Sequence, residues 1–175
     1  MLTGTTIESI DATHAPAGPD ACRRNQLLRA VGYGTLVSGV LDATDGVIAF
    51  GLLGMNPIQV LQYIASGAFG PAAFEGGLVT AAAGAVFHFL IALVAAAVYV
   101  TGATRLTVLR RQWIAAGLLY GMWVWGFMAF GVLPLTRVTA ITPTVPLLLN
   151  GVIGHAIFVG LPIAYFARRV GNSRM

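Results

Sequence analysis

Four ionisable side chains stand inside long apolar stretches of this sequence. Asp42 and Asp45 lie in the first stretch, His88 lies in the second, and His155 lies in the fourth. A charged side chain at the middle of a bilayer costs about 2.5–3.5 kcal/mol on insertion scales, so such residues are rare and usually functional. These four residues are therefore our candidates for binding protons or a ligand.

The first stretch carries its polar residues on one helical face. Thr35, Ser38, Asp42 and Asp45 are spaced three, four and three residues apart, which places them on the same side of an α-helix. Exposing both carboxylates to lipid would cost about 5–7 kcal/mol. We therefore expect this face to point into a helix bundle or an aqueous cavity, with Thr35 and Ser38 supporting the acids.

The two histidines lie on faces made of small residues. His88 shares its face with Gly84 and Ala92, and His155 follows Gly151 and Gly154. Small residues let membrane helices approach closely. Both imidazoles are therefore expected on packing faces and not against lipid.

Three chemistries fit this cluster. Imidazole titrates near neutral pH, so His and Asp can pass on a proton. Asp42, His88 and His155 can together ligate a divalent metal ion such as zinc, manganese or iron. The two histidines can also ligate a haem b from both faces. The alternative to all three is a structural role, in which the cluster makes only interhelical hydrogen bonds worth about 0.6 kcal/mol each.

The absence of known catalytic motifs argues against an enzyme. The sequence has no nucleotide-binding loop, no HExxH or CxxC motif and no Ser/His/Asp arrangement. Glu75 and Arg137 are the only acidic and basic residues expected on the external side of the membrane. We predict that they form an ion pair, the alternative being that Arg137 reaches the lipid headgroups. Trp123 stands near the middle of the third stretch and is a candidate to support a ligand pocket, or else to fill the bundle.

The elements that must position these residues are apolar helices. The chain of 175 residues is 57% hydrophobic and only 9% charged, against about 25% charged residues in soluble domains. A hydrocarbon core of about 30 Å needs about 20 helical residues. Four segments meet that length, namely Val31–Gly54, Gly77–Thr101, Trp113–Leu133 and Val145–Ala167. The predicted fold is an all-α, integral membrane four-helix bundle.

The remaining segments are short. Asn56 and Pro57 are typical of a helix start, and the run that follows is too short to cross, so we predict an external amphipathic helix. Residues 1–25 are predicted to be a disordered cytoplasmic tail, residues 26–169 the membrane domain, and residues 170–175 a second cytoplasmic tail.

The basic residues define an orientation. All ten are arginines, and nine of them lie before the first segment, between the second and third, or after the fourth. The positive-inside rule makes that side cytoplasmic, together with both termini. Arginine in place of lysine and the Ala/Gly/Val richness suggest a GC-rich bacterial genome, hence a multi-pass protein of the bacterial inner membrane.

The same features define the expected partners. The arginines form no cluster on a soluble face, so nucleic acid is not expected, and the partner is the lipid bilayer. Four helices make a thin bundle, and a second copy meeting it at the glycine-rich third segment, around Gly117 and Gly121, is a further candidate.

The order of these features resembles that of small four-helix inner-membrane proteins of bacteria, in the broad sense the YagU-type proteins. The likeness covers about Val31–Arg169 and lies in the acidic first segment, the run Leu61–Gly67, the run Glu75–Gly77, and the histidines of the second and fourth segments. The resemblance implies a four-helix membrane fold and a stress-related role. It supplies no catalytic residues.

Overall fold

The computed structural model describes residues 18–138, 141–142 and 144–170, and over these residues it is helical without a strand. Three helical stretches are long and apolar enough to cross a membrane: Gly77–Arg105, Trp113–Leu135 and Val145–Ala167. They coincide with the second, third and fourth predicted segments. The all-α fold class is confirmed.

The first long helix is α1 (Pro19–Gly51), with 33 residues. It begins earlier than the predicted membrane domain, because proline is well tolerated in the first turn of a helix. The stretch 19–25, which we assigned to a disordered tail, is therefore helical, while residues 1–17 lie outside the described part. The helix ends before the predicted boundary at Gly54, where a positive φ of 91° marks the turn.

The short helix α2 (Pro57–Phe69) begins as predicted. The Asn56 side chain accepts a hydrogen bond from the Gln59 backbone N–H, and the Gln59 side chain accepts one from the Asn56 N–H, each at 3.0 Å. This capping box satisfies two N–H groups that lack a helical partner. A 3₁₀ segment, η2 (Gly70–Glu75), connects α2 to the following helix.

Helix α2 packs against α3 (Gly77–Arg105). A Cβ at Gly84 would overlap the Leu61 carbonyl oxygen, so only glycine allows this close crossing. Gln62 is buried in the contact and donates to the Gly77 carbonyl at 3.0 Å. Gln62 therefore lies inside the molecule, although an amphipathic helix would be expected to expose its polar residues.

The second half of the chain forms two interrupted helices. The short α4 (Thr107–Arg111) leads into α5 (Trp113–Gly126), the π-helical η3 (Phe127–Val132) and the 3₁₀ segment η4 (Leu133–Leu135). After the connecting loop come α6 (Val145–Gly154), the π-helical η5 (His155–Gly160) and α7 (Leu161–Ala167). Such π-helical turns are rare and frequently occur at functional sites.

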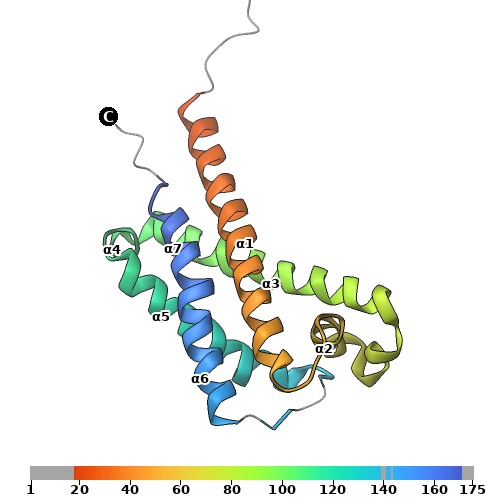
Figure 1. Cartoon of the computed structure of the whole chain (residues 1–175). Helices are drawn as coiled ribbons and strands as arrows, with labels where there is room; N and C mark the ends of the chain where they lie inside the picture. Colours follow the sequence, from red (N-terminus) through yellow and green to blue (C-terminus); the bar gives the residue numbers. More distant parts are fainter. Residues whose placement is uncertain (1–17, 139–140, 143, 171–175) are drawn as a thin grey trace, which may run out of the picture.

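The helices are joined through small residues. Helices α1 and α7 run alongside each other, α5 packs on α7 and η5, and α3 crosses behind α1 (Figure 1). A Cβ at Gly160 would overlap the Gly117 carbonyl oxygen, and one at Gly121 would overlap that of His155. The glycines at which we expected a second copy are therefore occupied by the chain's own last helix.

The three arginine groups gather at one end of the molecule. Arg110 donates to the Val170 carbonyl at 2.8 Å, and the Arg168 guanidinium lies 4.3 Å from the centre of the Trp113 ring. The first turns of α1, where Arg23 lies, are at the same end (Figure 1). Whether this end faces the cytoplasm stays a prediction.

Candidate functional site

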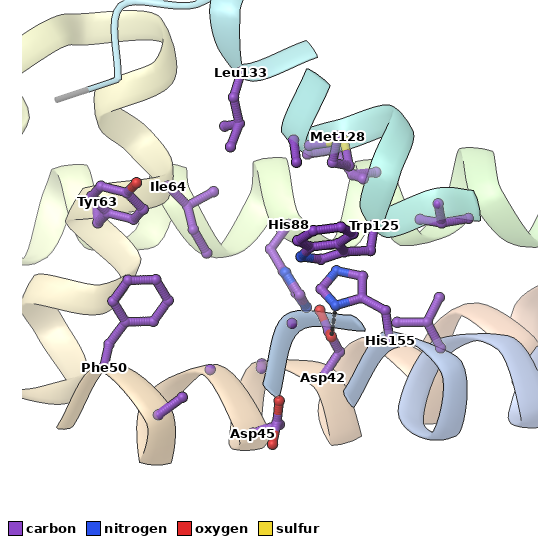
Figure 2. A pocket seen from close by; sticks show the side chains of 18 of the residues that line it. Asp42, Asp45, Phe50, Tyr63, Ile64, His88, Trp125, Met128, Leu133 and His155 are labelled. Carbon is purple, nitrogen blue, oxygen red and sulfur yellow. Dashed lines mark ion pairs between the residues drawn. The ribbon is translucent and has the colours of Figure 1, made fainter. Parts of the chain in front are cut away.

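A cavity of about 760 Å³ lies between α1, α2, α3 and the two interrupted helices. The four ionisable residues singled out in the sequence all line it, although they come from three different helices (Figure 2). Its polar wall consists of Ser38, Asp42, Asp45, His88, Asn150 and His155. Most of the remaining lining is carbon, so the cavity is apolar with one polar wall.

Asp42 and His155 form a loose pair across the cavity (Figure 2). The His155 Nδ1 lies 3.6 Å from the Asp42 Oδ1, and the two side chains are 25% and 18% exposed. That distance exceeds a normal hydrogen bond, and the buried Nδ1 has no hydrogen-bond partner among the described residues. His155 is the first residue of η5. The two side chains are close enough to interact electrostatically, but they form no hydrogen bond with each other.

His88, by contrast, forms a hydrogen bond with another helix. Its Nε2 lies 2.8 Å from the Gly39 carbonyl oxygen on α1. A carbonyl oxygen can only accept, so this nitrogen carries the proton. The Phe89 ring meets His88 edge-on and fills the space beside Gly39, where a Cβ would lie 2.6 Å from the ring. His88 therefore joins α3 to α1.

Asp45 is also held by a second helix. The Asn150 side chain on α6 donates to the Asp45 Oδ2 at 2.9 Å. A Cβ at Gly154 would lie 2.6 Å from the same oxygen, so glycine makes room for the carboxylate. Sequence reasoning missed Asn150, although an amide inside an apolar segment, five residues before His155, was a usable signal.

The polar residues that share one face of α1 do not all reach the cavity. Ser38 is fully buried, lines the cavity and donates to the Thr35 carbonyl at 3.5 Å. Thr35 itself does not line the cavity, and its buried hydroxyl has no partner among the described residues. Ser38 is therefore placed to support the two acids, as predicted, whereas Thr35 is not.

The tryptophan beside the site is Trp125 and not Trp123. Trp123 is 56% exposed and stacks on Tyr120 and Phe127 at the outside of the molecule. Trp125, two residues on, lines the cavity, and its indole fills the space where a side chain at Gly151 would stand. The helix rotation therefore presents the other tryptophan to the cavity.

The predicted pair of Glu75 and Arg137 is not formed. Both residues are exposed, and the ion pair of Asp42 with His155 is the only one among the described residues. The Arg137 backbone N–H instead donates to the Gly67 carbonyl at 2.9 Å. This bond ties the start of the outer loop to α2, which borders the cavity.

The described residues form no ready-made site for a metal ion or a haem. Within residues 18–138, 141–142 and 144–170, no three His, Cys, Asp or Glu side chains are grouped closely enough to hold a metal ion. Asp42, His88 and His155 share a cavity but not a coordination sphere. The Nε2 nitrogen of His88 also cannot ligate an iron while it donates to Gly39.

The aromatic end of the cavity lies between α1 and α2. The rings of Phe50 and Tyr63 are 5.3 Å apart between their centres, and both line the cavity (Figure 2). Burial raises the pKa of the Tyr63 hydroxyl above its ordinary value. This group therefore stays neutral at physiological pH and adds no charge to the cavity.

No family model, curated protein or solved structure matches this chain. The resemblance to YagU-type proteins stays a prediction.

Proposed function

We propose that this chain is a four-span protein of the bacterial inner membrane, with both termini in the cytoplasm and α1 as the first span. Large apolar side chains such as Leu36 and Ile48 are 55% and 61% exposed on α1, a pattern that suits lipid better than water. The carboxylates of the same helix line the cavity. The arginine-rich end would face the cytoplasm.

We further propose that the protein binds and releases protons at Asp42 and His155, in transport or in ion homeostasis. The observation that carries this proposal is that the His155 Nδ1 lies 3.6 Å from the Asp42 Oδ1 and has no hydrogen-bond partner among the described residues. Gaining or losing a proton here breaks no existing hydrogen bond. The pair also borders a cavity through which a proton or ligand could reach it.

A structural role is the second candidate, and specific contacts favour it for His88 and Asn150. His88 joins α3 to α1 through Gly39, and Asn150 joins α6 to α1 through Asp45. Such contacts contribute about 0.6 kcal/mol each on average in membranes. We therefore assign His88 chiefly to holding the helices together and Asp42 with His155 to proton binding.

The test is ¹⁵N NMR of the histidines in lipid nanodiscs, with and without Asp42→Asn. We expect the His155 signal to change with pH and this change to depend on the Asp42 charge, because the two side chains are 3.6 Å apart. Glu75→Gln, which removes an acid outside the cavity, is the control and should leave the titration unchanged. A His155 that keeps one protonation state throughout, or that ignores Asp42→Asn in a folded protein, would leave only the structural role.

A further inference from the structure

We propose that the cavity binds a hydrophobic organic cation, with the charged group against Asp42 and Asp45 and the apolar body against the aromatic end. This inference rests on the proposed function in one respect, because proton and cation would share the Asp42 carboxylate. It adds the chemical class of the ligand.

The size of the cavity suits a molecule better than a bare ion. Small-molecule sites measure about 300–1,000 Å³ and are mostly apolar with a few placed polar groups. This cavity, at about 760 Å³, lies in that range, and side chains such as Ile64, Met128 and Leu133 line it (Figure 2). A metal ion or a chain of waters would leave this apolar wall without a partner.

The charged groups of the wall favour a cation. Two carboxylates line the cavity, and none of its described lining residues is an arginine. The Asp45 carboxylate receives one bond from the neutral Asn150 amide, which orients it without cancelling its charge. An anion would therefore meet repulsion, and a cation would be attracted.

The aromatic rings suit the same ligand. Trp125 lies beside the Asp42–His155 pair, whereas Phe50 and Tyr63 lie at the other end of the cavity (Figure 2). A cation over an aromatic face gains about 0.5–2 kcal/mol, and tryptophan is the best face. The arrangement therefore holds the positive group near Trp125 and Asp42 and directs the apolar part towards Phe50 and Tyr63.

The experiment measures equilibrium binding of radiolabelled tetraphenylphosphonium to the full chain in lipid nanodiscs. Tetraphenylborate, an anion of the same shape, is the matched probe. We expect saturable binding of the cation and none of the anion. Asp42→Asn and Asp45→Asn should each weaken cation binding by about tenfold or more, which corresponds to about 1.4 kcal/mol. Asp42→Glu, which keeps the charge, and the control Glu75→Gln should bind.

Each outcome decides between the proposals. Equal binding of cation and anion, or unchanged binding in both folded asparagine variants, overturns the ligand class and points to a neutral amphipath. If one asparagine variant does not fold, the other decides; if neither folds, the anion probe on the wild-type protein decides. A His155 that titrates in a protein without cation binding overturns this inference alone. Cation binding without His155 titration overturns the proton proposal alone.

Discussion

The bond between Asn150 and Asp45 offers a sharp test of how the site is built. Replacing Asn150 with Leu keeps the size of the side chain but removes the hydrogen bond that Asn150 donates to Asp45 at 2.9 Å, the only one that the Asp45 side chain receives from the described residues. Hydrogen bonds to charged groups contribute about 1.5–3 kcal/mol in proteins. Interhelical bonds in membranes average about 0.6 kcal/mol and reach about 1.7 kcal/mol. Because Asp45 is only half-buried, we expect a coupling of about 1 kcal/mol.

The assay is a double-mutant cycle on the free energy of unfolding in lipid, with Asn150→Leu, Asp45→Leu and the pair. The coupling is the difference between the effect of the pair and the sum of the single effects. Thr44→Val is the control, since Thr44 is exposed and bonds only within its own helix, to the Val40 carbonyl. It should change stability little.

Two results would refute this reasoning. Additivity within about 0.3–0.5 kcal/mol would mean that the two side chains do not interact. Loss of cation binding in a folded Asn150→Leu protein would also contradict it, because the Asp45 charge remains and has lost a competing donor. We expect that variant to bind the cation at least as tightly as the wild-type protein.

Two further predictions concern packing and the cavity wall. Gly160→Ala should lower the free energy of unfolding by about 1–3 kcal/mol, because its Cβ would overlap the Gly117 carbonyl oxygen. Gly32→Ala, whose Cβ would meet nothing within 4 Å, should instead stabilise the helix by about 0.5–1 kcal/mol. Equal effects of the two variants in thermal unfolding would contradict the close helix contact. Trp125→Leu should weaken tetraphenylphosphonium binding several-fold, whereas Trp123→Leu should not, and the reverse order would mean that the cavity wall is wrongly identified.

Helical periodicity made part of the site predictable. Ser38, Asp42 and Asp45 recur at helical spacing, so they had to share a face, and the cost of charge in lipid required that face to point inwards. Both expectations match the cavity. The same stripe also contained Thr35, which the cavity does not reach, because a cavity has an end that periodicity cannot reveal.

The partners of the site residues were not predictable. His88 meets a backbone carbonyl and not another side chain, and the carbonyl that it reaches depends on how α3 crosses α1. The choice between Trp123 and Trp125 likewise depends on the rotation of one helix about its axis, which no local pattern determines in an almost uniformly apolar segment.

By itself the sequence determined the helical class, three of the apolar helices and the set of ionisable residues, because hydrophobicity and the 3.6-residue period are local properties. Only the tertiary structure decided that Asp42 is the neighbour of His155, that Asn150 holds Asp45, and that Gly117 packs within the chain. These contacts join residues far apart in sequence, and they follow from crossing points where glycines let backbones touch.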